Sequence, residues 1–158
     1  LSRAVLCVSQ ACREEFLAAA PGVEPSLVEV AHTGIPAIEP GDDEAARRKL
    51  LDAAGFPPQA VVACFVGVLS KRKGVPELAE CAVRLAGENP LLRFVLVGPD
   101  GGAADAFKAR VEGTAARAAC AWIGARPDPM DFMRGADMLV LPSLSDPFPL
   151  VEIGRAHV

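Results

Sequence analysis

The stretch Val61 to Gly74, Val-Val-Ala-Cys-Phe-Val-Gly-Val-Leu-Ser-Lys-Arg-Lys-Gly, joins a strand-like segment to three consecutive cations. Its first six residues are a continuous apolar run rich in β-branched side chains, which is typical of a strand covered on both faces in a parallel sheet. Gly67 ends this run. From Val75 onward apolar residues recur at helical spacing, and Pro76 stands in the first turn, so the pattern predicts a helix. The three cations therefore precede the positive end of a helix.

Lys71, Arg72 and Lys73 are locally unfavourable there, because a helix N-terminus carries about half a positive charge and prefers anions. Free backbone N–H groups at a helix start, with flanking glycines that allow close approach, form the usual phosphate-binding arrangement. The alternative is a solvated basic loop. The strand before the triplet and the helix after it favour the phosphate site.

Composition limits the class of protein. The chain has 158 residues, of which 51% are apolar and 23% charged, values that predict one globular domain rather than a disordered chain. A net charge of −4 gives no support to nucleic-acid binding or to attraction by anionic membranes. No apolar run approaches the roughly 18 residues needed to span a bilayer, and no signal-peptide pattern opens the chain. We expect a soluble, cytoplasmic protein.

The sequence gives little support to a metal or disulfide site. The five cysteines are scattered, no Cys-x-x-Cys pair occurs, and only two histidines are present, so we expect buried reduced thiols. The chain lacks Gly-x-Gly-x-x-Gly, Gly-x-x-x-x-Gly-Lys-Ser/Thr, Gly-x-Ser-x-Gly and Asp-x-Asp. These absences disfavour dinucleotide, P-loop and hydrolase functions and a carboxylate metal site.

Strand-like and helix-like segments alternate along the chain. The expected strands are Ala4–Val8, Leu27–Val30, Val61–Val66, Phe94–Val97, Ala119–Ile123 and Met138–Leu141. The expected helices are one capped by Ser9 and ending near Ala20, Glu44–Ala54, one from Val75, Ala103 to about Ala116, and Pro129–Arg134. This alternation predicts an α/β fold, a Rossmann-like parallel sheet with helices on both faces.

In such folds ligands bind at the carboxyl ends of the strands. The loops expected at that edge are Gly67–Gly74, Gly98–Gly102, Gly124–Arg126 and Ser143–Leu150, which predicts one shared cleft. Within it, Gly98–Gly102 either wraps a phosphate with backbone amides or is a turn of purely geometric origin.

Single polar residues are ambiguous by themselves. His32 is either a ligand-facing loop residue or a turn histidine beside Gly34. Asp146, after the last expected strand, either holds sugar hydroxyls or forms a turn. We assign Trp122 and Phe65 to the core.

Taken together, five segments resemble the C-terminal, donor-binding half of the retaining GT-B glycosyltransferases. They are Val5–Ser9, Val30–Ile35, Phe65–Gly74, Phe94–Gly98 and Ala136–Ser143. Phe65–Gly74 is similar to the signature Val-Gly-Arg-Leu-x-x-x-Lys-Gly, and Ala136–Ser143 to Ala-Asp-Val-Phe-Val-Leu-Pro-Ser. Each motif is degenerate alone, but five in the right order are specific.

The resemblance implies roles for several residues. Lys73 would neutralise the diphosphate of a nucleotide-sugar donor, and Gly67 would allow its close approach. The backbone at Ile123 and Gly124 would face the nucleotide base. Asp146 would stand at the first acid of the Glu-x7-Glu motif and contact the donor sugar, together with Phe148.

The implied reaction transfers a sugar from a nucleotide diphosphate to an acceptor with retention at the anomeric carbon. Neither a metal nor another cofactor is expected, because cationic side chains and a helix terminus stabilise the leaving diphosphate. The acceptor would be a lipid, a saccharide or a small molecule, with no nucleic-acid partner. The parent protein would associate peripherally with a membrane through an N-terminal domain absent here.

Three departures from the family pattern stand out. Val68 replaces an arginine that usually helps to hold the diphosphate, so Lys71 or Arg72 would have to substitute, or the site is weaker. Pro147 and Pro149 offer no N–H where this loop usually donates amides. Gly154 occupies the position of the second acid.

We expect residues 1–151 to be a truncated donor-binding domain without its acceptor-binding partner, and therefore inactive alone. We expect residues 152–158 to be a non-native tail, because the family pattern breaks within two residues of Glu152 and a common sequencing-adapter read would encode this segment. The alternatives are a non-catalytic nucleotide- or phosphate-binding α/β module, and a nucleotide-sugar epimerase of the same architecture.

Overall fold

The computed structural model describes residues 4–36 and 41–156, and these form two compact units. The first unit contains residues 4–36 together with Asp146–Leu150, and the second contains residues 41–145 and 151–156. Residues 37–40 and the last two residues of the expected tail lie outside the described residues.

The first unit is a small βαβ arrangement. Its elements are β1 (Val5–Cys7), α1 (Gln10–Ala19), a 3-10 helix η1 (Pro25–Leu27) and β2 (Val28–Val30). The two strands pair in parallel, with Val5 opposite Val28. Ser9 caps α1 as predicted, since its hydroxyl accepts the Cys12 N–H at 3.2 Å. The Arg13 side chain ties the helix to the strand by donating to the Val28 carbonyl at 2.8 Å.

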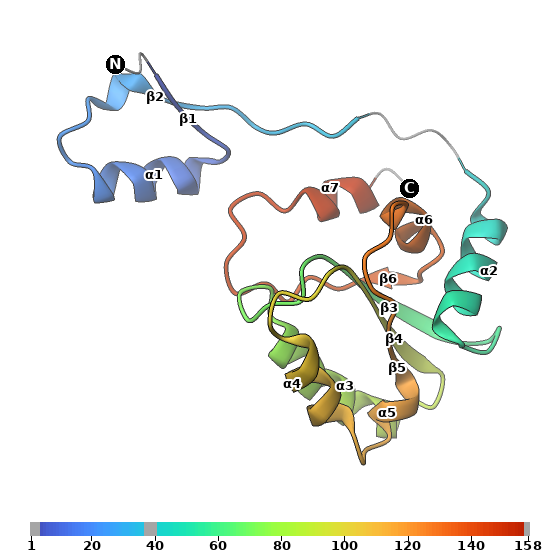
Figure 1. The fold of residues 1–158 in the computed structure, drawn as a ribbon. Helices are drawn as coiled ribbons and strands as arrows, with labels where there is room; N and C mark the ends of the chain where they lie inside the picture. The colour runs from blue at the N-terminus through green and yellow to red at the C-terminus, as the bar shows by residue number, and fades with distance from the viewer. Residues whose placement is uncertain (1–3, 37–40, 157–158) are drawn as a thin grey trace. The chain divides into compact units, whose positions relative to one another are not determined.

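The second unit is built on a four-stranded parallel sheet with the order β5-β4-β3-β6 (Figure 1). Its strands are β3 (Val61–Val66), β4 (Leu92–Val97), β5 (Cys120–Trp122) and β6 (Met138–Leu139). Its helices are α2 (Asp43–Ala54), α3 (Val75–Glu88), α4 (Ala104–Val111), α5 (Ala116–Ala119) and α6 (Pro129–Arg134). The last helix, α7 (Leu150–Arg155), runs from the end of the 146–150 segment into the second unit.

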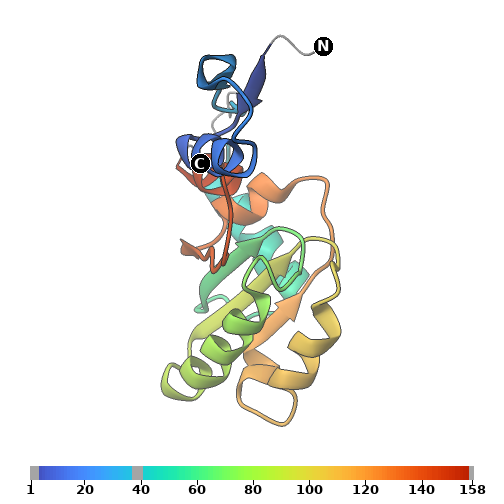
Figure 2. The same cartoon turned by 90° about the vertical axis from the view of Figure 1, so that its left-hand side faces the viewer.

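Alternation along β3 and β4 places apolar side chains on both faces of the sheet. Ala63 and Phe65 pack with α3, α4 and α5, whereas Val62 and Cys64 pack with α2 and α6. The sheet is thus the middle layer between two layers of helices (Figure 2). The predicted α/β class, with a parallel sheet covered on both faces, is confirmed.

Three details differ from the sequence-based prediction. The strands fall into two hydrogen-bonded sets rather than one, because β1 and β2 pair with each other and the other four described strands form a second parallel sheet. The helix expected from Ala103 to about Ala116 is broken at Gly113, which adopts a left-handed φ of 71° between α4 and α5. The expected non-native tail contributes to α7, which the sequence pattern did not predict.

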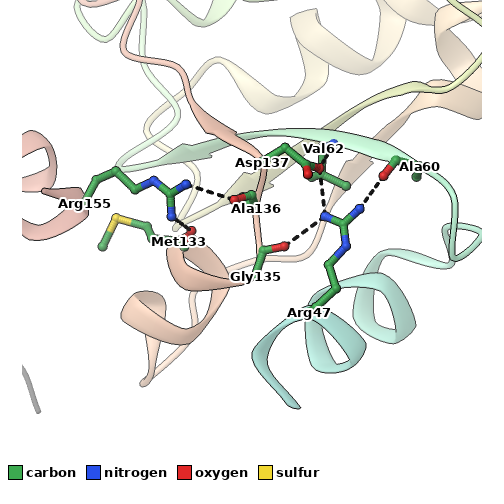
Figure 3. Close-up of polar contacts among 8 residues, drawn as sticks. All are labelled: Arg47, Ala60, Val62, Met133, Gly135, Ala136, Asp137 and Arg155. Atoms are coloured by element: carbon green, nitrogen blue, oxygen red, sulfur yellow. Dashed lines mark hydrogen bonds and ion pairs between the residues drawn. The ribbon is translucent and has the colours of Figure 1, made fainter. Parts of the chain in front are cut away.

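A partly exposed hydrogen-bond network anchors α2 to the sheet (Figure 3). The Arg47 guanidinium donates to the carbonyls of Gly135, at 2.9 Å, and Ala60, and to the Asp137 carboxylate at 2.9 Å. The same carboxylate accepts the Val62 N–H at 2.7 Å, at the start of β3. One arginine therefore joins α2, β3 and the turn before β6.

Arg47→Met should lower the free energy of unfolding by about 2 kcal/mol, because several hydrogen bonds from one charged donor are lost together. Arg48→Met is the matched control: its side chain is 63% exposed and pairs only with Glu44 in the described residues, so its cost should stay below about 0.5 kcal/mol. Urea denaturation followed by the fluorescence of Trp122, the single tryptophan, reports on the second unit. Equal effects of the two substitutions would contradict the anchoring role.

A second arginine fixes the end of the described chain. Arg155 donates to the carbonyls of Met133, at 2.7 Å, and Ala136, at 3.0 Å, and so attaches α7 to the end of α6 (Figure 3). None of the helices in the described ranges has the length and apolar character to cross a bilayer.

Candidate functional site

The candidate site lies at the carboxyl end of β3, where residues 70–74 turn into α3. Ser70 O accepts the N–H of Lys73 at 3.2 Å and of Val75 at 3.4 Å, and Gly74, with φ of 70°, is the residue before the helix. Pro76 has no N–H to offer. The start of α3 was predicted to offer free backbone N–H groups to a ligand. It does so only in part, because the Val75 N–H is already hydrogen-bonded and Pro76 has no N–H.

The three cations of this turn are not equivalent in the structure. Lys71 and Arg72 are exposed, while Lys73 is half-buried. The Arg72 guanidinium donates to the Ser145 carbonyl at 2.8 Å. Lys73 combines a cationic group with partial desolvation, which strengthens its interaction with an anion. Of the three, Lys73 has the environment that best suits a phosphate contact.

Three glycines bring neighbouring loops into backbone contact. Gly67 N–H donates to Val97 O at 2.9 Å, and Gly98 N–H donates to Gly124 O at 2.8 Å. A Cβ at Gly98 would lie 1.9 Å from Gly67 O, so this position admits only glycine. Gly67 has a φ of 156°, and a Cβ there would meet nothing nearer than the Phe65 ring, at 3.5 Å. The open side of Gly67 is compatible with close approach of a ligand.

The loop Gly98–Gly102 does not form a phosphate cradle. One carboxylate oxygen of Asp100 accepts the N–H groups of Gly102, Ala103 and Ala104, at 2.8, 3.1 and 3.1 Å. The Gly101 N–H donates to Leu69 O at 2.9 Å. The backbone N–H groups of this loop are thus used to start α4 and to attach the loop to residues 67–70. This favours the interpretation of Gly98–Gly102 as a turn rather than as a phosphate-binding loop.

These hydrogen bonds, the one from Ala104 first, hold the pKa of Asp100 below its ordinary value of 3.8. Because the folded-state pKa is lower than the unfolded one, the stabilisation is complete above the unfolded value and is lost as the pH falls through the folded value. Asp100→Ala should therefore lower the thermal midpoint by a few degrees at about pH 7, with the difference shrinking as the pH falls below the ordinary pKa of 3.8.

The matched control for this prediction is Asp105→Ala, whose side chain is 99% exposed in the first turn of the same helix. Its thermal midpoint should differ little from that of the wild type at every pH. A difference at Asp100 that persists unchanged into acid would contradict the capping role.

The segment Pro142–Ser145 lies against the turn at residues 70–74. Leu144 N–H donates to Arg72 O at 3.0 Å, and a Cβ at Gly74 would lie 1.8 Å from Pro142 O. The Ser143 hydroxyl is covered and has no hydrogen-bond partner in the described part of the chain. The loops 67–74, 98–103 and 142–145, together with Gly124, are thus contiguous at one edge of the sheet, whereas residues 146–150 of the expected Ser143–Leu150 loop belong to the first unit.

The residues predicted to face a nucleotide base lie where β5 ends. Ile123 and Gly124 are half-buried, and Gly124 has a φ of 75°. A groove beside β5 is lined by residues that include Ile123, Trp122 and Lys108. Trp122 is half-buried and packs against the core, with Lys108 Nζ 4.8 Å from its ring centroid. Its partial exposure was not predicted, because a tryptophan in a strand pattern ordinarily indicates the core, where Phe65 does lie.

Three other predicted residues belong to the first unit. The His32 and Phe148 rings stack, with centroids 5.2 Å apart and an interplanar angle of 16°. His32 Nδ1 lies 3.0 Å from Val8 O, which accepts its proton. Asp146 is half-buried in the same unit. The structure thus brings together His32 and Phe148, two residues that the sequence could not pair.

Two of the departures noted in the sequence have clear environments. Val68 is 44% exposed, and its apolar side chain brings no charge to the turn. Gly154 is buried, and a Cβ there would lie 3.4 Å from the Met130 side chain. Position 154 therefore faces α6 in the structure.

The predicted burial of the cysteines holds for Cys7 and Cys64, whereas Cys12, Cys81 and Cys120 are half-buried. All five are free, and burial raises the pKa of Cys64 and of Cys120 to about 12. In the described ranges, no three His, Cys, Asp or Glu side chains gather in a way that could hold a metal ion.

Comparison with known proteins gives a family match. The model of the family Glycosyl transferases group 1 matches residues 46–153. A D-inositol 3-phosphate glycosyltransferase of Streptomyces bingchenggensis is 33% identical over 144 residues, covering 84% of this chain and 31% of the relative. Its counterpart in Kribbella flavida is 32% identical over 145 residues, covering 84% of this chain and 33% of that relative. The chain thus spans about a third of the length of these curated relatives.

Solved structures share the fold. HepE of Anabaena, in complex with UDP-glucose, has a TM-score of 0.80 at 24% identity, covering 98% of this chain and 42% of that chain. WaaG, a glycosyltransferase involved in lipopolysaccharide biosynthesis, has a TM-score of 0.79 at 21% identity, covering 96% of this chain and 41% of that chain. At these identities the likeness is one of fold.

Proposed function

The chain belongs to the glycosyl transferases group 1 family, and from this we propose that it forms the nucleotide-sugar donor site of a GT-B glycosyltransferase. The full-length protein would transfer a sugar from a nucleotide diphosphate to an acceptor with retention of configuration. The family match covers most of the second unit, which contains the turn at residues 70–74. The relatives named as glycosyltransferases support a transferase activity.

The observation that carries this proposal is the half-buried Lys73 in the turn that follows Gly67 and the carboxyl end of β3. Breaking the bond between the sugar and the diphosphate leaves negative charge on the departing oxygen, and a fixed cation lowers the energy of that state. Lys73 would supply this charge, and Gly67 would leave room for the phosphates. Charge from protein side chains then replaces charge from a metal ion, so no cofactor is part of the proposal.

The remaining donor contacts follow the sequence prediction. The backbone of Ile123 and Gly124, at the end of β5, would face the base. Asp146 and Phe148 would contact the sugar. Lys71 is exposed and would act on the diphosphate only through its long-range charge.

A non-catalytic nucleotide-binding module is the second candidate. It is favoured by Val68, which is exposed where the family has an arginine, and by Gly154, which packs toward Met130 at the position of the second acid. Both differences remove groups that would act on the bound donor. The acceptor of the first candidate would be a lipid, a saccharide or a small molecule, and its location the cytoplasm, with peripheral membrane association through a further domain.

Isothermal titration calorimetry with UDP, GDP and ADP, and then with UDP-glucose and GDP-mannose, tests this proposal. We expect one nucleoside diphosphate to bind, and one nucleotide sugar to bind more tightly than its nucleoside diphosphate. Binding of the nucleoside diphosphate without any sugar dependence would favour the non-catalytic module. No binding of any of the five compounds would overturn the donor site.

A further inference from the structure

We propose that Arg72 is a positioning residue that holds the segment 142–145 in place, rather than a ligand of the donor diphosphate. This inference rests on the proposed function. It assigns to Arg72 a task different from the one that its place in the cationic triplet predicts.

Arg72 contacts the segment 142–145 at two successive residues. Its guanidinium donates to Ser145 O at 2.8 Å, and its own carbonyl accepts the Leu144 N–H at 3.0 Å. The side chain and the main chain of one residue therefore fix two neighbouring peptide groups. Such a paired contact restricts both the position and the direction of the segment.

The rest of the segment offers little other polar support. Pro142 has no N–H, and the Ser143 hydroxyl is covered and unpaired in the described ranges. The Pro142 carbonyl instead lies against Gly74, where a Cβ would come within 1.8 Å of the oxygen. Packing at Gly74 and hydrogen bonding at Arg72 together hold the segment against the turn.

The segment leads directly into the residues proposed to contact the donor sugar. Asp146 follows Ser145 in the chain, and Phe148 comes two residues later. Because Ser145 directly precedes these residues in the chain, a less firmly held segment would leave them less ordered, whereas Lys73 is on the turn itself. Loss of the Arg72 contact should therefore affect the sugar-dependent part of the affinity and spare the diphosphate-dependent part.

Calorimetry of Arg72→Met with UDP and UDP-glucose tests this division. We expect the affinity for UDP to stay within about twofold of the wild type, and the affinity for UDP-glucose to fall about tenfold, the equivalent of one charge-assisted hydrogen bond. Equal losses for the two compounds would overturn the proposal and assign Arg72 to the diphosphate.

Hydrogen exchange provides a readout that requires no ligand. In Arg72→Met the Leu144 amide should exchange about tenfold faster, because the segment opens more readily. Lys71→Met, which removes the neighbouring charge, should leave this amide unchanged. An unchanged rate in Arg72→Met would also overturn the proposal.

The two experiments separate failure of this inference from failure of the proposed function. A wild-type chain that binds neither UDP nor UDP-glucose, nor any other donor of the panel, overturns the donor site and with it the sugar-related role of Arg72. Faster exchange at Leu144 in the variant would still support the structural tether between Arg72 and the segment.

Discussion

Lys73→Met should weaken nucleoside diphosphate binding by about 30-fold, which corresponds to about 2 kcal/mol for one charge-assisted contact. Lys73 is half-buried, so its charge is less screened by water than that of its neighbours. Methionine keeps most of the aliphatic chain and removes only the ammonium group. Calorimetry with the nucleotide that the wild type binds measures the effect.

The matched control is Lys71→Met, two residues earlier in the same turn. The Lys71 side chain is exposed, so its removal should change the affinity by less than about threefold at physiological salt. Equal losses for the two lysines would mean that the turn acts as a diffuse basic patch. An unchanged affinity in Lys73→Met would remove the diphosphate role.

Gly74→Ala should lower the free energy of unfolding by about 4 kcal/mol. Alanine at a φ of 70° costs about 1–2 kcal/mol of stability. The shift that the new Cβ forces on its close neighbour costs about 1–3 kcal/mol more. The contact in question is with Pro142 O, 1.8 Å from the position of the new Cβ. Urea denaturation followed by Trp122 fluorescence measures the loss.

Gly113→Ala separates the two contributions. Gly113 has nearly the same φ, 71°, and no atom lies within 4 Å of the position of its Cβ. It should cost only the backbone part, about 1–2 kcal/mol. Equal losses of stability in the two variants would contradict the close packing of the turn at residues 70–74 against the segment 142–145.

Much of the fold could be predicted because its strongest signals are local. The apolar run Val61–Val66 predicted β3 with its observed bounds. The separation into two sheets could not be predicted, because periodicity shows which residues form strands but not which strands pair. The break at Gly113 could have been recognised, since glycine disfavours a helix interior.

The candidate site was predicted in part. The position of the cationic turn at the end of a strand followed from the sequence, as did the neighbouring loops. The direction of the Arg72 side chain did not, because it depends on Ser145, more than seventy residues later in the chain. The capping role of Asp100 could have been predicted, because the carboxylate of an aspartate commonly accepts a hydrogen bond from the backbone N–H two residues later in the chain.

The most direct test of the donor site is a titration of the ¹⁵N-labelled chain with UDP, followed by amide chemical shifts. We expect the largest shifts at Gly67 and Gly74, near the proposed diphosphate, and at Ile123 and Gly124, near the proposed base. Saturable shifts at these amides, reduced in Lys73→Met, would support the account. Shifts confined to other parts of the chain, or none at all with UDP, GDP and ADP, would contradict it.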